Sequence, residues 1–174
     1  MRVKFHIIAL FFVSFILLSC SENNSPGNAQ YITLNQLRIT PGYEWFDSEY
    51  NSYTPKQDVI DSIKKQFADS QADFILYVNP SCNCSGTQLT FPASIKVLHE
   101  AGIDEPRFKI YTMYNQSDNH PYMDNFKVIS LPSFFTLIDS LPRYSINDSL
   151  SYYMLHRPDS TWYIEDFVYR AIKD

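Results

Sequence analysis

The chain has 174 residues, of which 45% are hydrophobic and 16% aromatic, and this apolar content is too high for a disordered chain. It contains 14 Lys and Arg against 19 Asp and Glu, which gives a net charge of −5. Its four glycines lack the GxGxxG and GxxxxGK[ST] spacings that bring backbone amides close to phosphates, which excludes dinucleotide-binding and P-loop sites. The acidic balance, with no basic run beyond the first four residues, argues against nucleic acid as a partner.

The first twenty residues have the order of an export signal. Two basic residues precede an apolar run at 7–18, and the sequence LLSC then ends at Cys20. The run is too short to cross a bilayer as a helix. A small residue directly before a Cys resembles the bacterial lipobox, which implies a signal peptide over 1–19 and a diacylated Cys20 that anchors the protein to a membrane. A plain signal peptide, or an uncut short anchor, with an incidental Cys20 is the alternative.

Residues 20–30 are predicted to form a flexible tether, since they are polar and have no apolar period. Without the leader, the chain has 12 basic and 19 acidic residues and a net charge of −7. Polybasic attraction to anionic lipid is therefore missing, and anchorage depends on the acyl chains of Cys20. The remaining length, 31–174, has no internal repeat and predicts one folded domain.

The patterns that follow predict an α/β fold. Apolar residues at helical spacing predict a helix over 55–69 with Thr54 as its N-cap. The apolar run 74–78, ended by Asn-Pro, predicts a central strand buried on both faces. A second helix is expected between Cys84 and Gly102, with a kink at Pro92.

Alternating patterns at 108–114 and 132–138 predict two more strands. A polar loop with a short helix at about 121–126 is expected between them. A further strand and a closing helix at about 161–173 complete the chain. Because a helix joins strands 74–78 and 108–114, they are predicted to pair in parallel through a right-handed crossover.

Cys82 and Cys84 lie where the buried strand passes into the second helix. A thiol at a helix N-terminus faces unpaired N–H groups and the positive end of the helix dipole, which favour the nucleophilic thiolate. Two cysteines this close can approach the Cα separation of about 4.4 to 6.8 Å that a disulfide needs, and the small ring of a CxC pair predicts a strained, exchangeable bond. With Cys20 acylated, these are the only free thiols in a compartment that permits disulfides.

The order of these elements resembles the thioredoxin-like superfamily over about residues 43–173. The resemblance rests on the Cys at the helix start, on Pro92 eight residues after Cys84, and on Leu131-Pro132 before an apolar strand. It implies a central mixed sheet flanked by helices and a cis Pro132 that faces the active-site Cys.

The usual CxxC is replaced by Cys84-Ser85-Gly86-Thr87, which looks like a subfamily that keeps only the first Cys. Further residues similar to that subfamily stand ahead of the first helix: Trp45, Phe46, Tyr53 and Pro55. We expect the aromatic residues there to pack in the core or at its edge, with a partner-binding patch as the alternative.

Two registrations of the cysteines are open. The spacing to Pro92 places Cys84 at the nucleophile position and Thr87 at that of the usual resolving Cys, whereas the distance from the strand favours Cys82. We prefer Cys84, because a helix register slips less easily than a loop changes length. The resemblance then implies thiol–disulfide exchange on exported proteins in the cell envelope, periplasmic or at the surface. Cys84 attacks, Cys82 resolves, Thr87 hydrogen-bonds the thiolate and Pro132 orients the substrate.

Two other functions remain open. One is a redox-inert, lipid-anchored thioredoxin-like module that binds proteins. The other is a Cu(I) chaperone that uses the CxC pair and a His, because soft thiolates select Cu(I). Of His99, His120 and His156, which have no diagnostic spacing, only His120 in the loop before Pro132 is placed to reach the cysteines. The exchange reaction itself requires no cofactor.

Overall fold

The computed structural model describes residues 27–82 and 84–173. The predictions for 1–26, including the signal peptide and Cys20, lie outside this part of the chain. The described residues form an α/β fold with a five-stranded mixed sheet and six helices. Within the same residues, no helix has both the length and the apolar character needed to cross a membrane.

The sheet has the strand order β1-β3-β2-β4-β5. The bounds are β1 (Gln30–Ile32), β2 (Asp73–Val78), β3 (Phe108–Thr112), β4 (Ser133–Ile138) and β5 (Leu141–Ser145). Strands β2 and β3 are parallel, with Phe74 opposite Phe108, and the other neighbours are antiparallel. The predicted central strand and parallel pair are confirmed, because β2 lies in the middle and is buried from Phe74 to its end.

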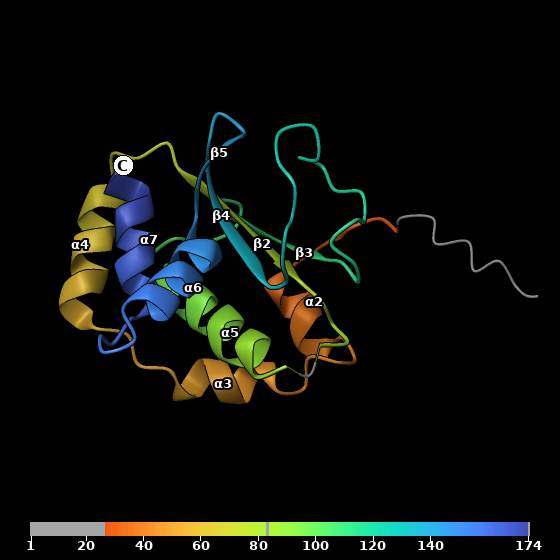
Figure 1. Ribbon diagram of the computed structural model, residues 1–174, viewed down its shortest axis with the longest axis horizontal. Coiled ribbons are helices and arrows are strands. Elements are labelled where there is room, and N and C mark those ends of the chain that lie inside the picture. Colours follow the sequence, from red (N-terminus) through yellow and green to blue (C-terminus); the bar gives the residue numbers. More distant parts are fainter. Residues whose placement is uncertain (1–26, 83, 174) are drawn as a thin grey trace, which may run out of the picture.

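Six helices cover one face of this sheet. They are α2 (Leu34–Ile39), α3 (Phe46–Ser52), α4 (Gln57–Phe67), α5 (Ser85–Glu100), α6 (Ile146–His156) and α7 (Ile164–Lys173). Figure 1 shows α4 to α7 gathered on one side of the strands. Each helix contributes buried residues to the larger core, which receives Phe74, Leu76 and Val78 from alternate positions of β2.

The opposite face of the sheet is covered by the segment between β3 and β4. Ile75 and Tyr77 of β2 pack there against Phe126, Val128 and other residues of that segment. The short helix predicted at 121–126 is wrong, because the segment forms only turns. Its apolar side chains are irregularly spaced, so one helix could not direct them all onto the sheet.

Several boundaries also differ from prediction. Helix α4 begins at Gln57 with Lys56 as its N-cap, so the prediction of Thr54 as the N-cap is wrong. The Lys56 N–H donates instead to Glu165 Oε1 at 2.9 Å. Glu165, a buried carboxylate in the first turn of α7, also accepts from the Tyr53 hydroxyl, and so joins the starts of α4 and α7. The elements β1, α2, α3 and α6 were not predicted.

Candidate functional site

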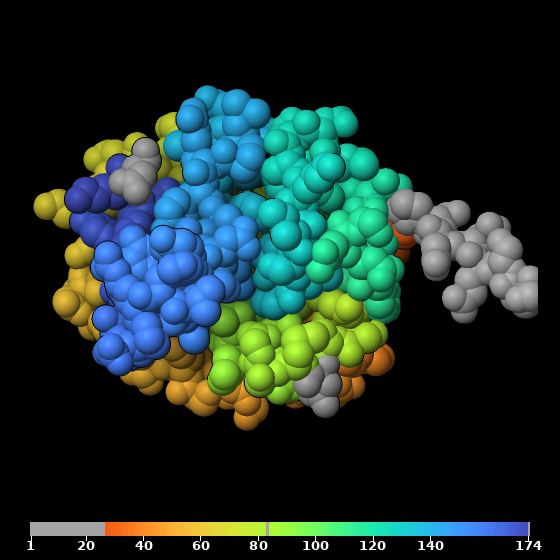
Figure 2. Space-filling model, viewed as in Figure 1, coloured from red at the N-terminus to blue at the C-terminus, as the bar shows by residue number. Residues whose placement is uncertain are grey.

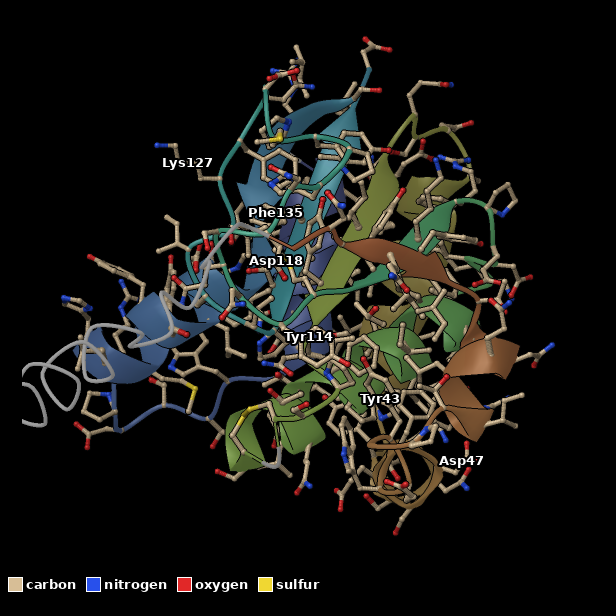
Figure 3. All side chains as sticks on the ribbon, turned by 90° about the vertical axis from the view of Figure 1, so that its right-hand side faces the viewer. Tyr43, Asp47, Tyr114, Asp118, Lys127 and Phe135 are labelled. Carbon is tan, nitrogen blue, oxygen red and sulfur yellow. A yellow bond between two sulfur atoms is a disulfide. The ribbon has the colours of Figure 1, made fainter. Side chains whose placement is uncertain are left out.

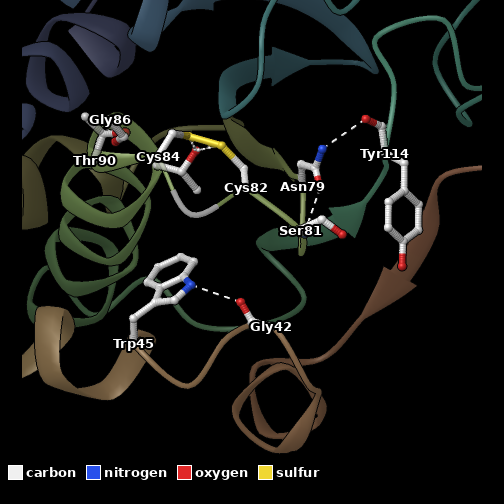
Figure 4. Close-up of a disulfide and its surroundings, with 10 residues drawn as sticks. Gly42, Trp45, Asn79, Ser81, Cys82, Cys84, Gly86, Thr90 and Tyr114 are labelled. Carbon is white, nitrogen blue, oxygen red and sulfur yellow. Dashed lines mark hydrogen bonds between the residues drawn. A yellow bond between two sulfur atoms is a disulfide. The ribbon is translucent and has the colours of Figure 1, made fainter.

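The loop between β2 and α5 holds the cysteines and is fixed by Asn79. Asn79 Oδ1 accepts from the Ser81 N–H at 2.8 Å, and its backbone carbonyl accepts from the Cys82 N–H at 3.2 Å. Its Nδ2 donates to the Tyr114 carbonyl at 3.0 Å, across to the segment after β3 (Figure 4). Sequence analysis used Asn79 only as the end of a strand, although an Asn before a Pro also favours such a turn.

The turn before α3 packs against this loop at Pro80. Gly42 has a positive φ of 97°, and a Cβ there would come within 2.5 Å of the Pro80 carbonyl oxygen. The Trp45 indole N–H donates to the Gly42 carbonyl at 2.9 Å (Figure 4). Tyr43 and Phe46 are buried in the core, which confirms that this aromatic segment packs inside the domain.

Cys82 and Cys84 form a disulfide, with their Cα atoms 5.2 Å apart. Cys84 is the N-cap of α5 and is exposed, whereas Cys82 is half-buried. Both cysteines therefore lie at the helix start, as predicted, and Cys84 holds the position closest to the helix N–H groups.

Thr87, in the first turn of α5, is completely buried against the disulfide. Its Oγ1 lies 2.9 Å from Cys84 Sγ and 3.6 Å from Cys82 Sγ. Because neither disulfide sulfur carries a proton, the threonine hydroxyl is the donor. Thr87 therefore donates to a sulfur of the disulfide, and its hydrogen bond to the Cys84 thiolate stays a prediction.

An open pocket of about 460 Å³ lies beside the disulfide. Cys82 and Leu131 line it, together with Asn79 and the turn 114–117. The peptide bond between Leu131 and Pro132 is cis, as the resemblance implies. The fold thus brings Cys82 and the residue before Pro132 to one pocket, and no side chain that lines it carries a charge.

Asp118 holds the turn that forms one wall of this pocket. Its carboxylate accepts from the N–H groups of Tyr114, Asn115 and Gly27, at 2.9, 3.1 and 2.9 Å. Burial alone would raise the pKa of Asp118, but these backbone hydrogen bonds outweigh it and the pKa is lowered. Figure 3 labels Asp118 and Tyr114 on this side of the molecule. Sequence analysis missed Asp118, which is one of many loop carboxylates in the chain.

The start of the described chain is bound to the same turn. Besides the Gly27 contact, the Ala29 N–H donates to the Asn119 carbonyl at 2.7 Å. The last residues of the predicted tether, 27–30, therefore lie against the domain, and residues 28 and 119 form a β-bridge. The chain thus joins the domain beside the disulfide pocket.

The contacts recorded for the three histidines are with tyrosines and other aromatic residues, and not with the cysteines. His99 Nδ1 is 3.0 Å from the Tyr50 hydroxyl, and His120 Nδ1 is 3.0 Å from the Tyr77 hydroxyl. Burial lowers the pKa of both rings. His120 is buried in the smaller core and not in a solvated loop, and exposed His156 stacks on a tyrosine of α6. Among residues 27–82 and 84–173, no group of three or more His, Cys, Asp or Glu could hold a metal ion.

The site therefore combines two joined sulfurs at a helix start, a buried hydroxyl donor and an uncharged open pocket. Comparison with known proteins finds no matching family profile, curated protein or solved structure. The chemistry of the site is consequently inferred from its own residues.

Proposed function

We propose that this chain is an exported, lipid-anchored protein whose thioredoxin-like domain exchanges thiols and disulfides with other exported proteins. The observation that carries the proposal is the Cys82–Cys84 disulfide at the start of α5, beside an open pocket. Its place after the central strand, with a parallel β3 and a cis Pro132 before an antiparallel β4, supports the thioredoxin-like assignment.

In the reducing direction, the Cys84 thiolate attacks one sulfur of a substrate disulfide. A Cys84–substrate disulfide forms, and the other substrate sulfur leaves as a thiolate that takes up a proton. Cys82, having lost its proton, then attacks Cys84 Sγ and closes the internal disulfide, and the second substrate sulfur leaves. Two electrons pass from the cysteine pair to the substrate disulfide, and the reverse sequence oxidises a substrate dithiol.

The surrounding residues would favour these steps. Thr87 and the N–H groups at the start of α5 stabilise negative charge on Cys84, which raises the fraction of Cys84 that is present as the attacking thiolate. Asn79 and Asp118 hold the walls of the pocket at fixed positions. The pocket itself gives a substrate segment access to Cys82.

The pocket favours a second assignment of the two sulfurs. Cys82 lines it and Cys84 does not. In the oxidised protein, a substrate thiolate held there would attack Cys82 Sγ and release Cys84 as the stabilised thiolate. The mixed disulfide would then form on Cys82.

The two assignments differ in which single variant traps a substrate. If Cys84 is the attacking residue, Cys82→Ser retains a mixed disulfide with a substrate peptide on Cys84. If Cys82 carries the substrate, Cys84→Ser is the variant that retains it. Non-reducing mass spectrometry of each variant, after incubation with a peptide disulfide, identifies the cysteine involved.

Thiol–disulfide exchange is tested by mass spectrometry of the alkylated full chain equilibrated in glutathione redox buffers. We expect a reversible Cys82–Cys84 disulfide with a potential between about −270 and −120 mV, the range of known exchange catalysts. A bond that resists reduction below about −300 mV, or two thiols that stay reduced and unmodified, would contradict exchange and support a redox-inert binding module. Stoichiometric Cu(I) binding that both Cys82→Ser and Cys84→Ser abolish would support a copper chaperone instead.

A further inference from the structure

A second open pocket, of about 600 Å³, meets the disulfide pocket at Tyr114, which lines both. Its walls come from β1, from α2 with the residues after it, and from the ends of β2 and β3. In Figure 4, the Tyr114 side chain extends beside β1, away from Cys82. The two pockets are therefore neighbours that share Tyr114, and Cys82 lines one of them.

Every side chain that lines the two pockets is uncharged, although the whole chain has a net charge of −5. The Gln30 amide supplies a hydrogen-bond donor and an acceptor, and the Gln36 amide supplies N–H donors, since its oxygen already accepts from Thr33. Apolar surface comes from Tyr31, Ile39 and Tyr114, which are 50%, 83% and 63% exposed. A charged ligand group would lose hydration here without gaining an opposite charge, whereas peptide groups and uncharged side chains find partners.

One further feature suits an extended polypeptide. Strand β1 is the last strand at one edge of the sheet, so its outer edge has no strand partner among the described residues. Such an edge can receive an added strand through main-chain hydrogen bonds.

We infer that the pocket between β1 and α2 binds an extended, uncharged segment that flanks the reacting cysteine of a substrate polypeptide. The inference rests on the proposed exchange function and extends it to substrate choice. Tyr114 stands at the junction, where the substrate chain passes from the sulfur to the second pocket. Substrates with acidic or basic residues in that segment react more slowly, because their charges would lose part of their hydration against a lining that holds no opposite charge.

The experiment measures rates of disulfide exchange with the full chain in detergent micelles. Each of two peptides carries one cysteine as a mixed disulfide. The residues that flank this cysteine are Asn, Tyr and Leu in the uncharged peptide and Asp and Glu in the acidic peptide. The small neutral disulfide of 2-mercaptoethanol is the reference. The uncharged peptide should react about tenfold faster than the acidic one, since a difference of 1.4 kcal/mol corresponds to tenfold.

The variant Ile39→Glu adds a charge to the second pocket at an 83% exposed position, where it should not impair folding. Its matched control is Leu155→Glu, which adds the same charge at a 77% exposed leucine of α6 that lines neither pocket. Ile39→Glu should slow the uncharged peptide and leave the rate with the small disulfide unchanged, and Leu155→Glu should change no rate. If Ile39→Glu leaves the uncharged peptide as fast as before, or slows the small disulfide equally, the inference is wrong.

A binding measurement separates this inference from the exchange function. The variant with both Cys82 and Cys84 changed to Ser is titrated into the fluorescent uncharged peptide carrying Ser for Cys, and anisotropy is recorded. Binding that Ile39→Glu weakens supports the pocket even if the wild-type protein exchanges no disulfide. If the protein exchanges with the small disulfide but shows no preference between the peptides, the exchange function stands and the proposed role of the second pocket is wrong. Displacement of the peptide by a neutral oligosaccharide that itself binds more tightly would also overturn it.

Discussion

Thr87 has one hydroxyl proton and two sulfur neighbours. In the oxidised protein, Thr87 Oγ1 lies 2.9 Å from Cys84 Sγ and 3.6 Å from Cys82 Sγ, and the Thr87 side chain is fully buried. After reduction, the same proton would favour whichever sulfur bears the negative charge, because hydrogen bonds to charged groups are the stronger ones. The shorter distance makes Cys84 the favoured thiolate.

The variant Thr87→Val should slow alkylation of reduced Cys84 by iodoacetamide at pH 7 by about tenfold, since a hydrogen bond to a charged group contributes about 1.5 to 3 kcal/mol. Valine keeps the shape of the buried side chain and removes only the donor. The rates are measured by mass spectrometry of each cysteine.

The matched control is Thr90→Val, one turn further along α5, where the hydroxyl donates to the Gly86 carbonyl at 2.7 Å. It should leave the alkylation rate unchanged. Equal rates for Thr87→Val and the wild-type protein would show that Thr87 only fills space.

At the scale of elements, Asp118 joins two segments that are distant in sequence. It ties the start of the described chain at Gly27 to the turn that follows β3, through hydrogen bonds from three backbone N–H groups. An asparagine has only one acceptor oxygen in its side chain, so it cannot satisfy all three donors as the carboxylate does.

The variant Asp118→Asn should lower the free energy of unfolding by about 2 kcal/mol at pH 7, within the range for hydrogen bonds to a charged group. The folded pKa of Asp118 lies below its ordinary value of 3.8. Its stabilisation is therefore complete above pH 3.8 and is lost as the pH falls through the folded pKa. Urea unfolding should show the two proteins converging in acid.

The control for that measurement is Asp124→Asn, an exposed carboxylate in the same segment between β3 and β4. Its difference from the wild-type protein should be close to zero at every pH. A similar loss in both variants would mean that total charge, and not the Asp118 hydrogen bonds, sets the stability.

The elements that sequence analysis predicted are those with a long, regular pattern. Helices α4 and α5 span several turns with apolar residues and β2 is an unbroken apolar run, so local signals suffice. Helix α2 has six residues and β1 has three, and their stability depends on distant partners such as the Tyr31–Tyr111 pairing. A capping box at Thr33 and Gln36 was a readable signal for α2 that went unused.

The candidate site divides in the same way. Cys82, Cys84 and Thr87 lie within six consecutive residues, so the spacing predicted that the cysteines can pair, and the resemblance implied the place of Thr87 beside them. Tyr114 and Asp118 reach the site only because β2 and β3 are parallel neighbours whose ends meet. Nothing in their local sequence distinguishes them from other polar loop residues, and their roles follow from tertiary contacts alone.

At the scale of the whole molecule, the two faces of the sheet have different coverings. Six helices and a large core lie on one face, and an irregular loop lies on the other. Figure 2 shows the surface of that loop beside the start of α5. The cysteines lie at the junction of the two coverings, and β2 and α5 on either side of them are packed in the larger core.

Reduction of the disulfide should therefore change the free energy of unfolding by no more than about 1.6 kcal/mol, which the chain-entropy relation gives for a closed loop of about three residues. The bond joins residues only two positions apart, so it restricts the unfolded chain very little. Urea unfolding followed by circular dichroism, with and without dithiothreitol, measures the difference.

The variant with Ser at both cysteines is the control and should match the reduced protein. Loss of cooperative unfolding on reduction would contradict this expectation and would identify the bond as a structural crosslink.

The attachment of Gly27 to Asp118 limits how far the disulfide pocket can be from the N-terminal anchor. Cys20 and Gly27 are seven positions apart, and a fully extended chain spans at most about 3.6 Å per residue, or about 25 Å in total. With Cys20 acylated as proposed, the tether between the lipid and the domain is short, so the disulfide pocket remains close to the lipid surface. Cysteines of membrane proteins that lie near the bilayer are then within its reach, whereas those at the far end of a tall ectodomain are not.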